Sequence, residues 1–169
     1  MEMLDLIHTR RSIRKYQDRP VEMEIIKEII AAGTSAPSAG NQQPWHFVVI
    51  TDRGLLAKVP DIHPHAQMAR EAPAAILVCG DPSLEKHKGY WVQDCAACTE
   101  NILLAVHAKG LGAVWTGIYP REERAENFRK LFHIPVSVIP FAFIPLGYPA
   151  HEAGRVDRYR EERAHYDRW

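Results

Sequence analysis

Residues 90–109 form the longest segment with helical character in this chain, and they constrain the fold more than any other stretch. Apolar and small side chains lie on nearly every side of this segment: Trp91, Val92, Cys95, Cys98, Ile102, Leu103, Leu104 and Val106. A helix that is apolar almost all round must be buried on several sides. In a chain of only 169 residues, this surface predicts a helix shared with a second subunit.

Apolar periodicity and helix punctuation place the remaining elements around this helix. We expect helices over Met3 to His8, Glu22 to Ala32, Arg53 to Val59 and Arg121 to Phe132. We expect strands over His46 to Thr51, Ala74 to Gly80, Ala113 to Tyr119 and Val138 to Tyr148. Gly33 is expected just after the second helix ends. Pro140 and Pro145 predict bulges or an edge position for the last strand. The stretch from Pro60 to Met68 shows no regular pattern.

The last segment, residues 150–169, is dense in charge and has few apolar residues, so it cannot form a core of its own. It is either disordered or packed on another surface. The terminal Trp169 favours packing, and a partner subunit is the natural surface. We therefore expect one domain over residues 1–169, with 150–169 as a tail on the partner.

Charge and composition exclude several classes of protein. The 21 basic residues balance the 21 acidic ones, which argues against nucleic acid or an anionic membrane as the main partner. No apolar span is long enough to cross a bilayer. The first residues, with Glu2 and Asp5, do not form a secretory signal. Three cysteines, an odd number, argue against a disulfide framework, so we expect a cytoplasmic protein.

Histidines and cysteines offer a metal-binding alternative. His63 and His65 form a His-x-His pair that could bind a metal together with His87 or the cysteines, as in a metal-binding regulator. Zinc sites usually show tighter ligand spacing, so we predict no metal site. Cys95 and Cys98 lie inside the long helix rather than at its N-terminus, where a redox pair would gain a low thiol pKa. They are interpreted as small core side chains.

Two short stretches carry the chemistry. Residues 10–16, Arg-Arg-Ser-Ile-Arg-Lys-Tyr, combine guanidinium groups and a hydroxyl, which together can bind a phosphate. Residues 35–47 form a stiff polar loop that ends in Trp45 and suits a planar heteroaromatic ligand. Taken alone, the first stretch would be a solvated face or a nucleic-acid patch, and the second an ordinary loop.

Together, these stretches resemble the FMN-dependent nitroreductase family, which has an Arg-Arg-Ser-x-Arg motif followed by Ala-Pro-Ser-x-x-Asn-x-Gln-Pro-Trp, here Ala36 to Trp45. The resemblance continues along the chain in the same order. Its further matches are Ala72-Pro73, Trp91 to Asp94, Gly-Leu-Gly at Gly110, Ile134-Pro135 and Gly147-Tyr148-Pro149.

The resemblance implies a fold and a set of cofactor contacts. The fold would be an α+β three-layer sandwich, with a mainly antiparallel central sheet between helices, in an intertwined homodimer with FMN at the interface. Arg10, Arg11 and Ser12 would hold the FMN phosphate, and Arg14 would reach the pyrimidine edge. The residues implied for the rest of the flavin are Pro37, Ser38, Ala39 and Asn41 from the other subunit, the turn Trp115, Thr116, Gly117 and Ile118 near N5, His65 or Gln67 at the pyrimidine end, and Arg158 and Arg160 from the tail.

The function implied is an FMN-dependent oxidoreductase. NAD(P)H would reduce FMN, and a small planar, electron-poor acceptor (a nitroaromatic, a quinone or a flavin) would then enter the same space, giving a ping-pong mechanism. The flavin carries the chemistry, so no catalytic side chain is expected. Thr116-Gly117 departs from the Glu-Gly of many relatives, which leaves the nicotinamide contacts open. A flavin-binding carrier or sensor without turnover is the other alternative, and the choice between NADH and NADPH stays open.

Overall fold

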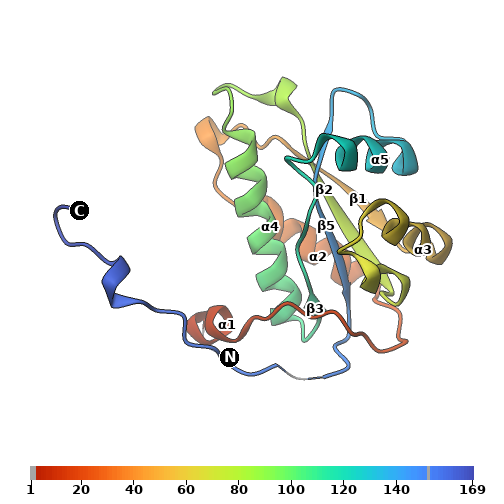
Figure 1. Cartoon of the computed structure of the whole chain (residues 1–169), viewed down its shortest axis with the longest axis horizontal. Helices are drawn as coiled ribbons and strands as arrows, with labels where there is room; N and C mark the ends of the chain where they lie inside the picture. Colours follow the sequence, from red (N-terminus) through yellow and green to blue (C-terminus); the bar gives the residue numbers. More distant parts are fainter. Residues whose placement is uncertain (1–2, 152) are drawn as a thin grey trace.

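The computed structural model describes residues 3–151 and 153–169, and its chain forms a central sheet with helices on both faces (Figure 1). The helices are α1 (Met3–Thr9), α2 (Met23–Thr34), α3 (Arg53–Ile62), α4 (Trp91–Ala108) and α5 (Glu122–Phe132). The strands are β1 (Trp45–Ile50), β2 (Ala74–Gly80), β3 (Gly112–Ala113), β4 (Thr116–Gly117) and β5 (Ile139–Gly147). Short 3₁₀ turns are η1 (Ala39–Asn41), η2 (Gln67–Arg70), η3 (Pro82–Leu84) and η4 (Glu161–Arg163).

The sheet runs in the order β1, β2, β5, β3, and β4 also pairs with β5. All of these strand pairs are antiparallel. Along β2, Ile76 and Val78 enter the core under α2 and α4, whereas Ala75 and Leu77 enter the core under α3 and α5. Because both faces of β2 are covered, its sequence is continuously apolar. The predicted α+β three-layer sandwich is confirmed.

Helices α2 and α4 cover one face of the sheet and pack closely on each other (Figure 1). Ile26 and Ile29 of α2 are fully buried. Gly33 was expected to follow this helix, but it lies inside it. A Cβ atom at Gly33 would stand 2.7 Å from Cγ1 of Ile102, so the missing side chain permits the close approach of α4. The helix ends at Thr34, and Pro37 follows three residues later.

Helices α3 and α5 cover the other face. The side chain of Asp52 caps α3 by accepting a 2.9 Å hydrogen bond from the Leu55 backbone N–H. Pro60 lies within the last turn of α3, which continues to Ile62. The prediction of an end at Val59, with an irregular stretch from Pro60, was therefore wrong for residues 60–62. Phe128 of α5 is fully buried against Phe143 of β5, with ring centroids 5.6 Å apart.

Strand β5 lies between β2 on one side and β3 and β4 on the other, so the edge position suggested by its prolines was wrong. The alternative, a bulge, is present: the β2–β5 register shifts between Val78 and Cys79, opposite Pro140. The single strand expected over Ala113 to Tyr119 is instead two short pieces, β3 and β4. They pair with different parts of β5.

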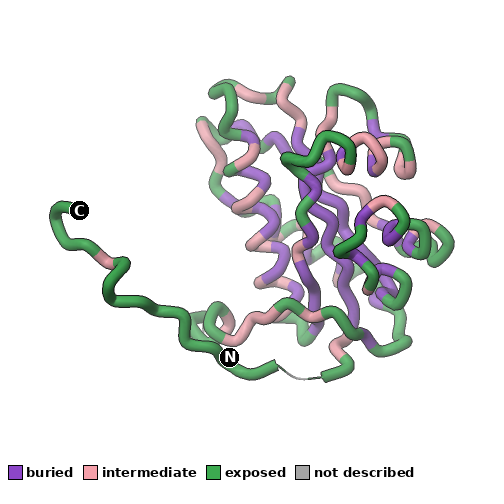
Figure 2. Tube along the Cα trace, in the orientation of Figure 1, coloured by how far each residue is buried: buried purple, intermediate pink, exposed green. Residues whose placement is uncertain are grey.

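Helix α4 turns its buried face toward the sheet and α2, as the purple segments of Figure 2 show. Ile102 is completely buried within the single chain. Leu104 is half-buried and belongs to neither core. Much of the apolar surface of α4 is thus covered by the chain itself. Sharing of this helix with a second subunit stays a prediction.

The tail extends away from the rest of the chain and is exposed along most of its described length (Figures 1 and 2). Tyr166 is 78% exposed and Trp169 fully so. Packing of residues 150–169 on a partner, and the assignment of residues 1–169 to one domain, stay predictions. Residues 1, 2 and 152 of these ranges lie outside the described residues.

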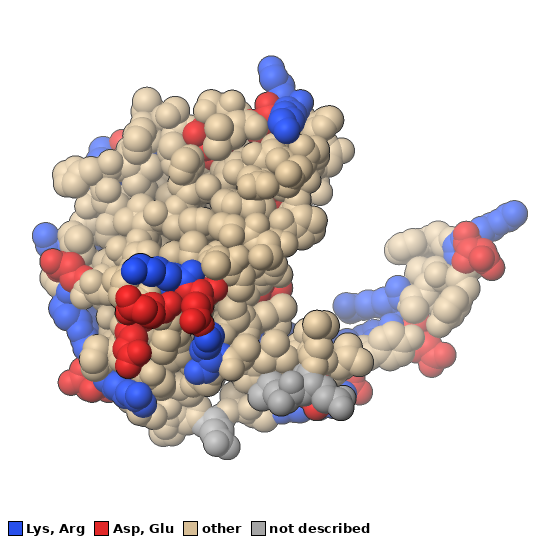
Figure 3. Space-filling model, turned by 180° about the vertical axis from the view of Figure 1, so that it is seen from behind, with Lys and Arg blue, Asp and Glu red and all other residues tan. Residues whose placement is uncertain are grey.

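Charges of both signs lie beside one another on the face shown in Figure 3. Two ion pairs of α2 are examples of such neighbouring charges. Lys27 Nζ lies 3.6 Å from Glu24 Oε1, and Glu28 pairs with Lys109, which follows the end of α4. Among the helices of the described residues, none has the length and apolar content that a membrane span requires.

Candidate functional site

The N-terminal segment after α1 lies along β3 and places the first group of predicted site residues. The Ile13 backbone N–H donates a 2.9 Å hydrogen bond to the Ala113 carbonyl, and Ser12 forms a parallel bridge with Ala113. The side chain of Ile13 fills the space beside Gly112, where a Cβ atom would be only 2.7 Å from it. Arg10, Arg11 and Ser12 are thereby fixed beside the strand that leads to Trp115.

Arg11 is the residue of this segment best suited to bind an anion. Its Nη1 donates to the Arg10 carbonyl, but its Nε and Nη2 atoms are buried and have no hydrogen-bond partner among the described residues. A buried guanidinium N–H without an acceptor is costly, and a phosphate would supply acceptors with matching geometry. Arg10 is held beside it by an ion pair with Glu100 at 3.2 Å.

The tail closes a cavity of about 220 Å³ against these arginines. Arg158 lines it together with Arg10 and Arg11, so the structure brings three predicted phosphate ligands together. Its other lining residues are Ile7, His8, Arg155, Val156, Asp157 and Tyr159. Arg160 is not among them, and its Nη1 donates to the Tyr159 carbonyl instead. Arg14 is exposed farther along the segment.

Sequence reasoning missed His107, which adjoins the same arginines. Its Nε2 lies 2.9 Å from the Thr9 hydroxyl, and both residues line a second cavity of about 350 Å³ with Arg11. The pKa of His107 is lowered, first by burial and then by the charges of Arg10 and Arg11. The positive charges of Arg10 and Arg11 thus disfavour protonation of the partly buried His107 imidazole. No spacing pattern in the sequence connects His107 with residues 9–11.

The loop between α2 and β1 holds the second group of predicted residues: Pro37, Ser38, Ala39 and Asn41. The Ser38 hydroxyl accepts a 3.0 Å hydrogen bond from the Gln43 N–H, and Asn41 Oδ1 accepts a 2.8 Å bond from the Gln43 side chain. The Ala39 N–H donates to the buried carboxylate of Asp94 at 3.0 Å. Pro37, Gly40 and Asn41 are exposed, so this loop offers an outer surface to a ligand.

This loop and the arginine cluster (Arg10, Arg11 and Arg158) touch different parts of α4. The loop meets the helix at Asp94, whereas Arg10 meets it at Glu100 and Thr9 meets it at His107. At a rise of 1.5 Å per residue, Asp94 is about 9 Å from Glu100 and about 20 Å from His107 along the axis. In Figure 1, α1 likewise lies at the far end of α4 from η1. One chain therefore separates the two groups of predicted ligands.

The turn predicted to face N5 begins beside Phe141 and runs through β4. The Thr116 hydroxyl donates a 2.7 Å hydrogen bond to the Phe143 carbonyl, so it is directed into the sheet. Gly117 is exposed, and its carbonyl accepts a 2.7 Å bond from Arg124. The side chain of Ile118 is fully buried, so Ile118 can offer a ligand only backbone groups.

His65 and Gln67 lie beside α3, where both have neighbours within the chain. Gln67 accepts from Arg70 at 2.8 Å and donates to the Pro64 carbonyl. The rings of His65 and His63 meet edge to face at 6.1 Å. No contact in the described residues brings His65 or Gln67 to the arginine cluster or to residues 35–44 between α2 and β1, the Ser38 loop.

His63 is buried, and neither of its ring nitrogens has a hydrogen-bond partner among the described residues. The pKa of His63 is lowered to about 4, first by burial and then by the charge of Arg124. The Gly117 backbone is near enough to offset part of this shift but does not form a hydrogen bond of ordinary geometry. The imidazole is therefore neutral at physiological pH.

The metal-binding alternative lacks a ligand set in the part of the chain that the structure describes. His87 lies against Gly40 and Tyr90, away from His63 and His65. Within the described ranges, no three His, Cys, Asp or Glu side chains are grouped to hold a metal ion. All three cysteines are buried. Burial raises the pKa of Cys79 and Cys98 to about 12 and also raises that of Cys95, which agrees with a core role for these thiols.

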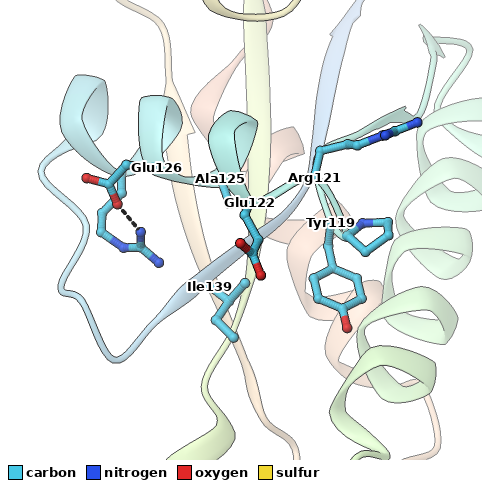
Figure 4. A pocket seen from close by; sticks show the side chains of 8 residues that line it. Tyr119, Arg121, Glu122, Ala125, Glu126 and Ile139 are labelled. Carbon is cyan, nitrogen blue, oxygen red and sulfur yellow. Dashed lines mark hydrogen bonds and ion pairs between the residues drawn. The ribbon is translucent and has the colours of Figure 1, made fainter.

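A larger cavity, of about 480 Å³, opens between α5 and the start of β5 (Figure 4). Tyr119 and Arg121 lie at one side, and Glu126, paired with Arg129, lies at the other. The Tyr119 ring meets Trp91 of α4 edge to face, with centroids 4.9 Å apart. The cavity follows directly after the Thr116–Gly117 turn in the chain. It is open and lined by both apolar and charged side chains.

Comparison with known proteins gives a consistent result along most of the chain. The model of the Nitroreductase family matches residues 7–66 and 62–148. A protein of Methanothermobacter thermautotrophicus, proposed to be an NADH dehydrogenase/NAD(P)H nitroreductase, is 54% identical over 169 residues, which cover 100% of this chain and 88% of that one.

Solved structures agree with the sequence matches. A crystal structure from Parabacteroides distasonis, with the same proposed description, has a TM-score of 0.94 and 41% identity, and the match covers 98% of each chain. A nitroreductase-like protein from Desulfovibrio desulfuricans, solved in complex with FMN, has a TM-score of 0.84 and 32% identity, over 98% of this chain and 96% of that one.

Proposed function

Because the chain belongs to the nitroreductase family, we propose that it is an FMN-dependent oxidoreductase that takes electrons from NAD(P)H. It passes them to a small planar, electron-poor acceptor such as a nitroaromatic, a quinone or a free flavin. The names of its relatives support both the nicotinamide donor and the flavin. A cytoplasmic location is part of the same proposal.

The observation that carries the proposal is the pair of buried Arg11 nitrogens, Nε and Nη2, that have no partner among the described residues and lie beside Arg10 and Arg158. This cluster fits the phosphate of FMN, because a guanidinium fork binds a phosphate bidentately. Ser12, the next residue in the chain, is the proposed hydroxyl ligand of the same phosphate. A flavin phosphate would thus satisfy donors that the chain alone leaves without acceptors.

The rest of the flavin would be held by groups that orient it. Arg14 supplies a positive charge for the pyrimidine edge, and the Ser38 loop supplies hydroxyl, amide and backbone groups. The Thr116–Gly117 turn contributes backbone groups, since the Thr116 hydroxyl is already bonded to Phe143. His65 and Gln67 are the proposed pyrimidine neighbours, and Arg160 is a secondary phosphate ligand from the tail.

When bound, FMN supplies the two-electron chemistry, accepting electrons from the reduced nicotinamide and giving them to the acceptor. The protein's residues bind and orient the cofactor and tune its charge. A guanidinium near the flavin's pyrimidine edge stabilises negative charge that develops there. The donor and the acceptor use the same open space in turn, which gives ping-pong kinetics.

We also propose that the active unit is a homodimer in which each flavin is bound by both chains. The separation of the arginine cluster and the Ser38 loop along α4 supports this arrangement, because the loop meets the first turn of the helix at Asp94, whereas Arg10 meets it at Glu100 and Thr9 meets its last turn at His107. The exposed tail with Trp169 supports it too, since a partner would bury this aromatic side chain. Arg158 would then complete the phosphate cluster.

The test begins with the visible spectrum of the purified protein. We expect flavin absorbance, release of FMN on denaturation, and steady oxidation of NADH or NADPH when a quinone is supplied. Double-reciprocal plots of initial rate against donor concentration, at several fixed acceptor concentrations, should give parallel lines, as a ping-pong mechanism requires. Protein that neither contains nor takes up FMN would contradict the proposal. Protein that binds FMN without oxidising either nucleotide would support the flavin carrier or sensor instead.

A further inference from the structure

Asp94 and Gln42 form a buried hydrogen-bond network beneath the Ser38 loop. Asp94 is 4% exposed and Gln42 is 7% exposed. One carboxylate oxygen of Asp94 accepts from the Ala39 N–H at 3.0 Å, and the other accepts from the Gln42 side-chain amide at 2.6 Å. Gln42 Oε1 in turn accepts from the backbone N–H groups of Lys86 and His87, at 2.9 and 3.1 Å.

This network fixes a loop whose backbone is not in a relaxed conformation. Gly40, Asn41 and Gln43 have φ angles of 55°, 52° and 48°, and two of them are not glycine. A Cβ atom at Gly40 would also stand 2.7 Å from Nε2 of His87. Such conformations persist where the surrounding structure holds them in place. The contacts to Asp94 and to residues 86–87 provide that hold.

The order of donors and acceptors explains why a carboxylate stands at position 94. Both atoms that face it, the Ala39 nitrogen and the Gln42 amide nitrogen, are donors. No lysine or arginine within the described residues forms an ion pair with Asp94, so its charge is held by these donors at the first turn of α4. An asparagine would turn one of the two contacts into a donor facing a donor.

We propose that Asp94 and Gln42 are positioning residues for the cofactor: they hold the Ser38 loop in the shape that meets the flavin. Through Gln42, they also tie this loop to the connector at Lys86 and His87. The inference rests on the proposed function, because it takes the Ser38 loop to be a flavin-binding surface. Neither residue needs to touch FMN.

Three variants test the network through its donor–acceptor order. Asp94→Asn leaves one donor–donor contact in every arrangement, since turning the Gln42 amide places its NH₂ against Lys86 and His87. Gln42→Glu sets two carboxylates against each other. The double variant Asp94→Asn/Gln42→Glu restores a complete order with one bond reversed. The new amide on α4 would then donate to the new carboxylate in the loop, and the net charge would equal that of the wild type.

The measurement is the Kd for FMN, from quenching of flavin fluorescence by the apo protein, together with thermal unfolding of the same samples. Each single variant should raise the Kd at least about tenfold, equal to roughly 1.4 kcal/mol, and the double variant should return it to within about threefold of wild type. If a single variant does not fold, recovery of folding and FMN binding in the double variant supports the same network.

Cys98→Ala is the matched control, because it removes a buried group from α4 without touching the network. It should lower the unfolding temperature and leave the Kd unchanged. The inference is overturned if both single variants bind FMN like wild type, if the double variant is no better than the worse single variant, or if Cys98→Ala weakens binding equally. A wild-type protein that binds no FMN would instead overturn the proposed function.

Discussion

Near His107, helix α4 borders the Arg11 guanidinium, two nitrogens of which lack a partner among the described residues, whereas near Asp94 it borders a loop whose buried polar side chains are paired. Arg11 has two orphan nitrogens at the first end. At the second end, Asp94 and Gln42 use every side-chain oxygen and the one amide nitrogen between them. At the first end, an anionic ligand could pair donors that the described residues leave unpaired. At the second end, the buried polar side chains are already paired within the chain.

The difference separates two ways in which a protein prepares a binding site. An unpaired buried donor is unfavourable until a ligand arrives, so part of the binding free energy comes from relieving it. A fully paired network gains nothing directly from the ligand, but it holds a loop in a shape that would otherwise relax. Binding then costs less ordering entropy. Variants at the arginine end should therefore lose contacts to the ligand itself. Variants at the Asp94 end should weaken binding by releasing the loop.

The largest effect on the free energy of folding is expected from a charge placed in the buried face of α4. Ile102→Glu buries an unpaired charge where Ile102 packs against Gly33, and it should cost about 3–5 kcal/mol of folding free energy. Urea unfolding followed by circular dichroism measures this loss. Leu104→Glu is the matched control on the less buried side of α4, and it should preserve the fold of the chain while weakening assembly in sedimentation. Equal loss of folding in both variants would contradict this assignment of the two sides.

A mixed dimer tests whether the two ends serve different flavins. Chains with Arg11→Ala and chains with Gln42→Glu, carrying different affinity tags, are refolded together and the mixed dimer is isolated. If each site takes its arginines from one chain and its loop from the other, one site has both defects and the other has none. The mixed dimer should then bind a single FMN with wild-type affinity. If each chain builds its own site, no normal site remains.

His63 shows how an unpaired group behaves when it is neutral rather than charged. Its pKa is about 4 in the folded chain and about 6.5 when unfolded, so only the unfolded state binds the proton between these values. Stability is fully present above about pH 6.5 and falls as the pH drops toward 4, by up to about 3 kcal/mol. Urea unfolding at several pH values should show a smaller loss in His63→Leu. An identical pH profile for the two proteins would refute this account.

The smallest of these effects should be the sharpest test of the arginine end. Arg11→Ala should weaken FMN binding by about 2 kcal/mol, the usual size for a charge-assisted contact. The stability of the apo protein should not fall and is expected to rise, because removing the buried Nε and Nη2 donors, which have no partner among the described residues, relieves more free energy than the loss of the Nη1 bond to the Arg10 carbonyl costs. Fluorescence titration and thermal unfolding measure the two quantities. Arg53→Ala, which removes a surface arginine paired with Asp18, should change neither FMN binding nor stability appreciably.

Local patterns predicted most of the fold. The apolar run of β2 and the 3.6-residue periodicity of α2 and α5 depend on neighbours in sequence, and these elements appear within a few residues of their expected bounds. The errors came from distant contacts. Gly33 looks like a helix end until Ile102 is placed beside it. Pro140 suggests an edge until the register shift in β2 accommodates it.

The candidate site also contains residues that local sequence predicts and residues that only distant contacts reveal. Arg10, Arg11 and Ser12 stand together in the sequence, so their shared chemistry is visible before folding. Asp94 and Gln42 belong to different elements, and no spacing rule joins them. Their roles depend on the direction of individual hydrogen bonds, which only the folded chain defines.

The exposed tail provides a natural reporter of assembly. It carries five arginines, Arg155, Arg158, Arg160, Arg163 and Arg168, on a segment that lies outside both cores. Trypsin cuts after arginine and needs an extended, accessible substrate, and exposed segments of this kind are preferred sites of nicking. An isolated chain would therefore lose its tail within the first moments of digestion. A tail covered by a partner would survive, so the lifetime of the intact chain under trypsin measures how long two subunits stay together.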